Sequence, residues 1–253
     1  MGARWGKSAM KSLKGMSVLV TGGGSGIGLG TARYCIERGA RVTICGRRED
    51  KIQAAAAELG DACCGVAADV TLAADRQKLL EAAIHHGGQL DALINNAGNM
   101  YRGAITELDE TALQEVFHTN VIAAMMLTGL CTPSLAQKEG AVVFVGSIHT
   151  RRAFPGASPY AATKAAVQGL TRVLAAELGE QRIRRNCLLP GAVVTEMTQR
   201  AGLMDDETAL QRLEGMSDLH ALGRIGTTEE IAEAMAYLIC AEWVTGAMID
   251  IDG

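Results

Sequence analysis

One stretch decides the fold of this 253-residue chain: Val18-Leu19-Val20-Thr21-Gly22-Gly23-Gly24-Ser25-Gly26-Ile27-Gly28. Its first three residues are a short apolar run typical of a buried strand, and a helical pattern follows the glycines as far as Gly39. Glycines let the backbone turn tightly and approach a pyrophosphate over the positive end of the helix dipole. A phosphate-binding P-loop would end in Gly-Lys followed by Ser or Thr, and this stretch does not. The unit therefore predicts the start of a dinucleotide-binding fold.

The rest of the chain alternates short apolar runs with helical patterns. Further strands are predicted at residues 41–45, 62–67, 91–95, 141–147, 183–188 and 247–251, and helices at 49–59, 72–86, 109–137, 160–178 and 228–240. Nearly continuous apolar strands that alternate with helices predict a parallel sheet covered on both faces. We therefore expect one α/β domain over residues 1–253, a Rossmann-type doubly wound parallel sheet of about seven strands. Residues 1–12 are expected to form a disordered arm.

The bulk composition argues against several classes of function. The formal net charge is −4 and no block of basic residues occurs, so nucleic-acid binding has little support. The longest apolar stretch, Val121 to Leu130, is too short and too polar to span a bilayer, so no membrane partner is expected. The seven cysteines are an odd number without metal-ligand spacing, which predicts no metal site and fits a reducing, cytoplasmic location.

A second feature carries chemistry. Tyr160 and Lys164 stand four positions apart in a helix-compatible segment, so both lie on one face of the predicted helix. A phenol has a reference pKa of about 10, and an ammonium group within a few ångströms favours the phenolate form. Such a pair can exchange a proton near neutral pH, as a general acid or base must. Taken alone, the pair is better explained as an ordinary surface tyrosine and lysine on a helix.

The motifs follow one another in an order that resembles the short-chain dehydrogenase/reductase family. The first is the spacing Thr-Gly-x-x-x-Gly-x-Gly from Thr21 to Gly28. The segments that match the family further along the chain are Asp69-Val70, Asn95-Asn96-Ala97-Gly98, Gly146-Ser147, Tyr160 with Lys164, and Pro190-Gly191 with Thr195. The resemblance covers residues 13–253 and implies an NAD(P)-dependent enzyme that acts on CH–OH or C=O groups of a small molecule. Arg185 departs from the family pattern, because an apolar residue is usual at that position.

The resemblance also implies a nicotinamide dinucleotide bound at the edge where these motifs gather. Its contacts would come from Gly22, Ser25, Gly26, Ile27, Gly28, Arg47, Arg48, Asp69, Val70, Asn96, Ala97, Gly98, Tyr160, Lys164, Pro190, Gly191, Val193 and Thr195. NAD enzymes place an acidic residue at the end of the second strand, where it binds the ribose hydroxyls. Here Gly46 holds that position and Arg47 follows, and a guanidinium group pairs well with a 2′-phosphate. We therefore predict a preference for NADP(H), with NAD(H) as the alternative and with two solvated arginines as the other interpretation.

Four residues match the catalytic positions of the family. The resemblance implies that Tyr160 gives a proton to a carbonyl oxygen and that Lys164 lowers the pKa of the phenol and binds the nicotinamide ribose. Ser147 would donate a hydrogen bond to the developing oxyanion. Asn120 matches the helix asparagine that relays protons through water, although an asparagine satisfied by the backbone is compatible with the same position.

The substrate is the least defined part of this interpretation. His149 stands two residues after Ser147, which resembles some sugar and polyol dehydrogenases of the family, where it can meet a substrate hydroxyl; a loop histidine that touches only backbone is at least as compatible. Arg152 on the same loop could hold a carboxylate or phosphate, although adjacent basic residues on a loop are more often solvated. Residues 192–223 match the family's substrate lid, and Met197 there is a third candidate for substrate contact. The chain also resembles 3-oxoacyl carrier-protein reductases. We favour a general carbonyl or secondary-alcohol oxidoreductase; the alternatives are an NAD-dependent sugar or polyol dehydrogenase and a non-catalytic nucleotide-binding protein.

Two of the predicted helices carry apolar residues on more than one side. These residues are Val121, Ile122, Met125 and Met126 in one helix and Val167, Leu170, Val173 and Leu174 in the other. A helix that is apolar nearly all round needs a second covering surface besides its own sheet. Family members pair these helices, so the resemblance implies a homotetramer or homodimer.

Overall fold

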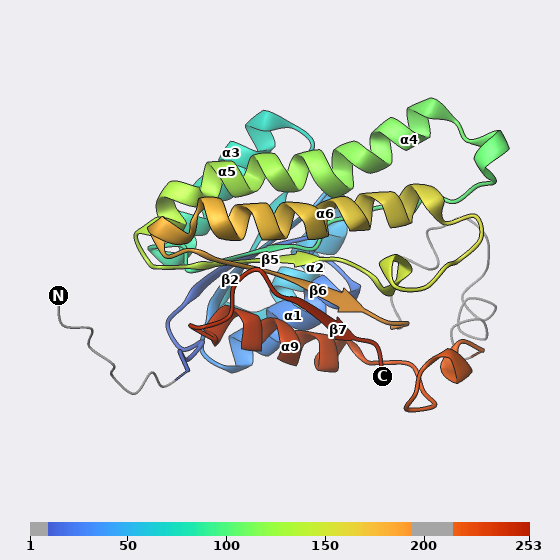
Figure 1. Ribbon diagram of the computed structural model, residues 1–253. Coiled ribbons are helices and arrows are strands. Elements are labelled where there is room, and N and C mark those ends of the chain that lie inside the picture. The colour runs from blue at the N-terminus through green and yellow to red at the C-terminus, as the bar shows by residue number, and fades with distance from the viewer. Residues whose placement is uncertain (1–9, 194–214) are drawn as a thin grey trace.

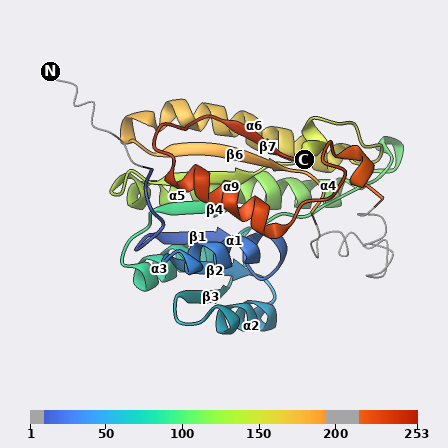
Figure 2. The same cartoon turned by 90° about the horizontal axis from the view of Figure 1, so that it is seen from below.

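The protein is built around a parallel sheet (Figures 1 and 2). The structure, a computed structural model, describes residues 10–193 and 215–253. The strands of this described part are β1 (Ser17–Thr21), β2 (Arg41–Gly46), β3 (Cys63–Ala67), β4 (Ala92–Asn95), β5 (Ala141–Val145), β6 (Arg184–Pro190) and β7 (Met248–Ile251). They lie in the order β3-β2-β1-β4-β5-β6-β7, and every neighbouring pair is parallel. The predicted doubly wound α/β fold is thus confirmed.

Helices cover both faces of this sheet. They are α1 (Gly26–Glu37), α2 (Glu49–Leu59), α3 (Ala73–Gly87), α4 (Glu110–Phe117), α5 (Ala123–Ala136), α6 (Ser158–Glu177) and α9 (Thr228–Cys240). In Figure 1, α5 and α6 run across one face, and α1 and α9 run across the other. Two apolar clusters fill the layers between sheet and helices, one centred on Val18, Val20 and Met235 and the other on Leu19, Leu127 and Phe144. Alternate residues of β1 therefore serve opposite cores.

Helix boundaries follow local capping chemistry where the sequence supplies it. The acidic residues Glu49 and Asp50 lie in the first turn of α2, and Gly60 ends that helix with a φ of 75°. α9 begins with a capping box in which Thr227 and Glu230 each bind the other's backbone N–H. Both helices have the bounds that the sequence predicts.

The predicted helix over residues 109–137 has an internal irregularity. A π-helical segment, His118–Ile122, joins α4 to α5, so the helical stretch runs over 27 residues from Glu110 to Ala136. By length and composition alone this stretch is sufficient to cross a membrane, and it is longer than the apolar run from Val121 to Leu130 that the sequence singles out. Leu127 and Leu135 are nevertheless fully buried in the core cluster beside the sheet, and the core helix of a soluble protein passes the same test.

Other boundaries differ from prediction by one to three residues. β5 ends at Val145, before Ser147, and β6 continues to Pro190. Residues 1–9 of the expected arm lie outside the described residues. Lys11 is held in place, because its backbone N–H donates to the carbonyl of Cys240 at 3.1 Å.

The strand order creates the place where a ligand can sit. β1 lies between β2 and β4, so the chain reverses its direction of progress across the sheet at the β1–β4 pair. In doubly wound sheets, crevices for ligands lie outside the carboxyl ends of the strands at such a switch point. The segments that follow β1, β4, β5 and β6 all begin at this edge.

Candidate active site

The glycine-rich loop after β1 excludes side chains at two key positions. Gly22 has a φ of 66°, and a Cβ there would stand 3.0 Å from the Cα of Ala97. A Cβ on Gly28 would stand 2.3 Å from the carbonyl oxygen of Gly22, a contact no real side chain makes. The loop therefore packs backbone against backbone at the start of α1, and the first turn of α1 carries no acidic side chain. This geometry fits a dinucleotide pyrophosphate, which needs close backbone approach and a helix N-terminus.

The segment after β4 is locked onto this loop. The hydroxyl of Thr21 accepts hydrogen bonds from the backbone N–H groups of Asn96, at 3.0 Å, and Ala97, at 2.9 Å. In return the side-chain amide of Asn96 donates to the carbonyls of Thr21, at 2.8 Å, and Gly22, at 3.1 Å. These hydrogen bonds hold the glycine-rich loop after β1 against the segment after β4, and both are predicted to bind the cofactor.

The predicted adenosine end lies after β2 and β3. The carboxylate of Asp69 accepts hydrogen bonds from the backbone N–H and the hydroxyl of Thr71, at 2.9 and 2.7 Å. Burial raises the pKa of Asp69, but these bonds from Thr71 and the positive charges of Arg47 and His118 together lower it below its usual value. The carbonyl of Val70 is held by the guanidinium of Arg76 at 2.7 Å. Arg47 is exposed at the end of β2 and acts electrostatically on Asp69, so both face the same region.

Asn120 lies inside the π-helical segment and is buried. Its side-chain oxygen accepts from the backbone N–H of Asn99 at 2.8 Å. Its amide nitrogen donates to the carbonyl of Asn99 at 2.9 Å and to the hydroxyl of Thr163 at 3.0 Å. The side chain thus joins the loop after β4 to α6, which carries Tyr160 and Lys164. The sequence left open that this asparagine is hydrogen-bonded to the backbone, and the structure shows such bonds to Asn99.

Tyr160 and Lys164 are both buried, with 6% and 4% of their surface exposed, so the interpretation as an ordinary surface pair is excluded. The ammonium nitrogen of Lys164 lies 5.5 Å from the centre of the Tyr160 ring and donates to the carbonyl of Val145 at 2.7 Å. Burial raises the pKa of Tyr160 to about 12, although a hydrogen bond from Ser147 opposes this rise. Burial also lowers the pKa of Lys164 to about 8. The expected net lowering of the phenol's pKa is therefore wrong for this structure, because desolvation outweighs the hydrogen bond from Ser147.

Ser147 follows β5 and is buried next to the phenol. Its hydroxyl oxygen lies 3.0 Å from Nδ1 of His149 and accepts the backbone N–H of His149 at 3.2 Å. The His149 ring also packs edge-on against Tyr160, with the ring centres 5.2 Å apart, and against Phe154 at 4.3 Å. Burial, together with the positive charges of Arg102 and Lys164, lowers the pKa of His149 to about 4, so the ring is neutral at physiological pH.

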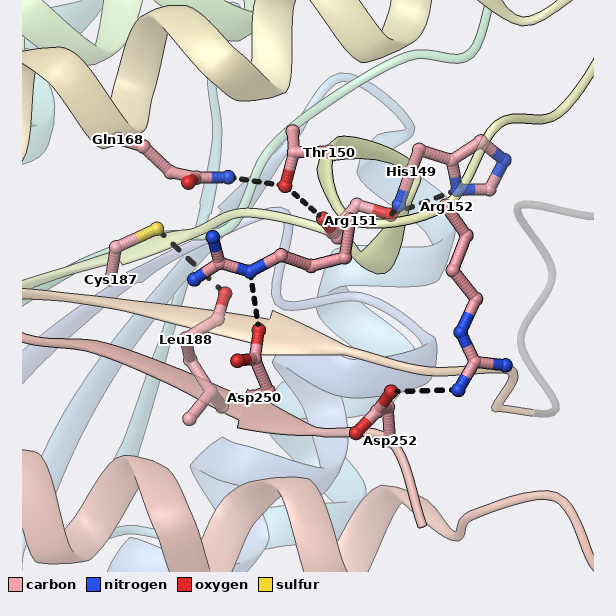
Figure 3. A network of polar contacts seen from close by, with 10 residues as sticks. His149, Thr150, Arg151, Arg152, Gln168, Cys187, Leu188, Asp250 and Asp252 are labelled. Carbon is pink, nitrogen blue, oxygen red and sulfur yellow. Dashed lines mark hydrogen bonds and ion pairs between the residues drawn. The ribbon is translucent and has the colours of Figure 1, made fainter. Parts of the chain in front are cut away.

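Figure 3 shows how the loop after Ser147 is tied down. The hydroxyl of Thr150 donates to the carbonyl of Ser147 at 2.8 Å, and the side-chain amide of Gln168, on α6, donates to Thr150. Arg151 pairs with Asp250, 3.1 Å away, at the end of β7. Arg152 pairs with Asp252 at 3.5 Å and donates to the carbonyl of Leu219. The Arg152 side chain predicted to contact substrate is thus directed to the C-terminal segment, and its role toward a substrate stays a prediction.

The segment after β6 approaches the C-terminal residues closely. A Cβ on Gly191 would stand 2.7 Å from the His220 ring. A hollow of about 280 Å³ opens here, lined by Gly191, His220, Arg224, Glu230, Asp250 and Asp252 among others. Pro190 and Val193 are buried beside Gly191, whereas the predicted contacts Thr195 and Met197 lie outside the described residues. The same holds for residues 194–214 of the predicted lid.

The structure brings together most of what the sequence singled out. Asn120, Ser147, Tyr160 and Lys164 converge at the ends of β4 and β5, beside the glycine-rich loop. Sequence reasoning missed the supporting residues Thr163, Thr150 and Gln168 as parts of the site, and it gave Thr21 no role beyond its place in the glycine-rich motif. Helical spacing offered one signal, since Thr163 and Gln168 lie three and eight residues after Tyr160 and therefore share its buried face. The described residues contain no cluster of three potential metal ligands.

Comparisons with known proteins agree with this geometry. The family model described as short chain dehydrogenase matches residues 16–206. A 3-oxoacyl-[acyl-carrier-protein] reductase from Chlamydia muridarum is 33% identical over 248 residues, covering 94% of this chain and 96% of the relative. Dehydrogenase/reductase SDR family member 4 from Sus scrofa is 32% identical over 259 residues, covering 99% of this chain and 91% of the relative.

A solved structure gives the same result in three dimensions. The crystal structure of 3-ketoacyl-(acyl-carrier-protein) reductase from Brucella melitensis complexed with NADH superimposes with a TM-score of 0.87 at 31% identity, covering 96% of this chain and 98% of the other. The fold, the convergent site and these relatives all lead to one assignment. The chain is an oxidoreductase of the short-chain dehydrogenase/reductase family.

Proposed function

We propose that this enzyme transfers hydride between NADP(H) and a carbonyl or secondary-alcohol substrate. The observation that carries the proposal is the buried phenol of Tyr160, which lies beside the Ser147 hydroxyl and one helical turn from Lys164. A proton donor and a hydrogen-bond donor thereby face the same point, next to a loop shaped for a dinucleotide.

The residues of this chain would hold the cofactor in three places. The backbone from Gly22 to Gly28 and the start of α1 would bind the pyrophosphate. The loop around Asp69 would border the adenine, and the Asn96–Gly98 segment with Lys164 would border the nicotinamide ribose. When bound, the nicotinamide supplies or accepts the hydride.

Tyr160 would transfer the proton that accompanies the hydride. Its pKa of about 12 keeps the phenol protonated at neutral pH, which suits a general acid in carbonyl reduction. Ser147 would donate a hydrogen bond to the same oxygen as negative charge develops there. Asn120 would act by holding the loop after β4 against α6, through Asn99 and Thr163.

Replacement of the phenol by phenyl tests this mechanism directly. In Tyr160→Phe the ring and its packing against His149 remain, so the fold and cofactor binding should be unchanged. We expect the rate of carbonyl reduction to fall by about 100-fold or more, since general acid catalysis contributes at least this much. Cofactor binding is measured by quenching of protein fluorescence and turnover by absorbance of the reduced nicotinamide. Turnover close to that of the unchanged enzyme would contradict the role given to Tyr160.

The preference for NADP(H) rests on the end of β2. Gly46 leaves no carboxylate there, and the exposed Arg47 lies in a region where its charge already stabilises an anion, Asp69. Arg47→Asp should lower the preference for NADP(H) over NAD(H) by about 10- to 100-fold, because a charge-assisted contact to the 2′-phosphate is replaced by repulsion. Lys138→Asp, an exposed position just before β5 at the opposite edge of the sheet, is the matched control. A cofactor ratio unchanged by Arg47→Asp would refute the assignment; the Brucella melitensis relative was solved with NADH, so either result is informative.

A sugar or polyol substrate is the second candidate, because His149 places an imidazole directly beside Ser147. Ketones, sugars, polyols and acyl thioesters should be screened with both cofactors. We further propose a homo-oligomeric, cytoplasmic enzyme, in line with seven free cysteines. A chain that binds NADP(H) but turns over none of these substrates would favour the non-catalytic alternative.

A further inference from the structure

The hydroxyl of Ser147 has one proton to give and two lone pairs with which to accept. The backbone N–H of His149 occupies one lone pair at 3.2 Å. Nδ1 of His149 is at hydrogen-bond distance, 3.0 Å, and its role depends on which ring nitrogen carries the proton. The hydroxyl is also hydrogen-bonded to the Tyr160 phenol, at the position where the reacting oxygen would arrive.

The two neutral tautomers of His149 have opposite consequences. If the proton is on Nε2, bare Nδ1 accepts the Ser147 proton, and the serine has nothing left to donate toward a substrate. If the proton is on Nδ1, the ring donates to Ser147, both lone pairs are filled, and the serine proton is directed to the phenol and the substrate oxygen. A hydroxyl that already accepts two hydrogen bonds is also a stronger donor, because chained hydrogen bonds polarise one another.

The surroundings hold the ring in the orientation that this contact needs. Phe154 stacks on one side with ring centres 4.3 Å apart, and the edge contact with Tyr160 fixes the other. The short helical turn Ile148–Thr150 sets the spacing between Ser147 and His149, and Thr150 and Gln168 fix that turn from behind. Such packing leaves the ring little freedom to swing away from Ser147.

We infer that His149 is a positioning residue for the reaction, which in its Nδ1–H tautomer donates to Ser147 Oγ and thereby aims the serine proton at the substrate oxygen. The inference rests on the proposed carbonyl chemistry and goes beyond it, since it gives His149 a task that does not require contact with substrate. It acts through Ser147 alone.

Three substitutions at position 149 distinguish hydrogen-bond donation to Ser147 from the shape of the side chain. Asparagine places an amide near Nδ1 and can donate to Ser147, so His149→Asn should keep kcat within about 5-fold. The aspartate of His149→Asp has the same shape as asparagine, but its carboxylate can only accept a hydrogen bond from Ser147. In His149→Leu the side chain can neither donate nor accept one. Both should lower kcat by about 10-fold or more with the KM for cofactor unchanged, because the oxyanion loses a donor. In a Ser147→Ala background, His149→Leu should cause no further loss of the residual rate.

The tautomer itself is measured without turnover. Long-range proton–nitrogen NMR of the full-length protein labelled with nitrogen-15 histidine, at about pH 8, should show an Nδ1–H signal that disappears in His149→Asn. Among the five histidines two give internal references. His220 donates from Nδ1 to the Asp252 carbonyl and accepts the Ala192 N–H at Nε2, whereas Nε2 of His86 faces the carbonyl of Ala62 at 3.1 Å and must donate.

The outcomes are distinguishable. An Nε2–H signal for His149, a His149→Leu enzyme as fast as the unchanged one, a His149→Asn enzyme as slow as His149→Leu, or an equal loss in the Ser147→Ala background would each overturn the inference. If the unchanged enzyme reduces none of the screened carbonyls, the proposed function fails, while the NMR tautomer still decides whether His149 donates to Ser147.

Discussion

At the scale of single residues, burial decides the charge state of this site. Tyr160 and Lys164 shift in opposite directions, to pKa values of about 12 and about 8, because desolvation penalises the charged form of each. The neutral phenol is the form that donates a proton in reduction, and the phenolate is the form that accepts one in oxidation. This charge state suits the carbonyl reduction proposed above at neutral pH.

This asymmetry predicts different pH profiles for the two directions. In the proposed mechanism alcohol oxidation needs Tyr160 deprotonated, and the fraction of phenolate grows with pH as long as the pH is below the pKa of about 12. We expect kcat/KM for oxidation to rise by up to tenfold per pH unit between about pH 6 and pH 8. Carbonyl reduction needs the phenol protonated, so its kcat/KM should stay flat over the same range. Steady-state profiles in both directions check this, and an oxidation rate independent of pH would show that another group limits proton transfer.

Sequence patterns identified the residues of the site but not their partners. Tyr160, Lys164, Ser147 and Asn120 are found from motif spacing. The pairing of Arg151 with Asp250 joins positions 99 residues apart in sequence and depends on the three-dimensional fold. The His149 contact with Ser147 is local, yet it requires the short helical turn that follows β5, and periodicity does not reveal a turn of three residues.

At the scale of elements, capping chemistry explains which boundaries the sequence could predict. α2 and α9 have sequence-encoded ends, in the acidic first turn and Gly60 of one and in the Thr227–Glu230 capping box of the other. The π-helical segment at His118–Ile122 has no comparable signal, because its extra residue is accommodated by packing around Asn120. Long-range packing, not local propensity, determines such irregularities.

The adjacent arginines of β6 show the same difference between sequence and structure. Arg184 reaches the end of α9, where its guanidinium donates to the carbonyls of Leu238, Ile239 and Ala241 at 2.7 to 2.9 Å. Arg185 is fully buried and donates to the carbonyl of Ile183, but its Nε and Nη2 atoms have no hydrogen-bond partner among the described residues. Burial lowers the pKa of Arg185 to about 10, against the favourable charge of Glu177.

Methionine at each position should therefore have opposite effects. Arg184→Met leaves the last carbonyls of α9 without a cap and should lower the free energy of unfolding by about 2–4 kcal/mol. Arg185→Met removes a buried charge that has few hydrogen-bond partners. The free energy of unfolding should therefore stay unchanged or rise by about 1 kcal/mol. Urea unfolding followed by circular dichroism compares the two variants. Equal destabilisation by both would mean that Arg185 is satisfied by a contact outside the described residues.

At the scale of the whole molecule, α5 and α6 keep large apolar side chains exposed after folding. These two helices run across one face of the sheet (Figure 1). Ile122, Met125, Met126 and Val173 keep between 46% and 54% of their surface exposed. The inner sides of the same helices are buried in the core through Leu127, Cys131 and Val167. Exposed apolar groups concentrated on two neighbouring helices are typical of a protein interface.

A charge placed in this surface should separate the subunits. We expect the unchanged protein to scatter light as a dimer or tetramer at micromolar concentration, and Met126→Glu to shift it to a smaller species, because burying an unpaired carboxylate in an apolar interface costs several kcal/mol, or about 100-fold or more in the association constant. Leu72→Glu is the matched control, since Leu72 is 56% exposed at the N-cap of α3 and belongs to neither α5 nor α6. Circular dichroism verifies that both variants stay folded. A monomeric unchanged protein, or equal dissociation by both substitutions, would show that the α5–α6 surface is not where the subunits meet.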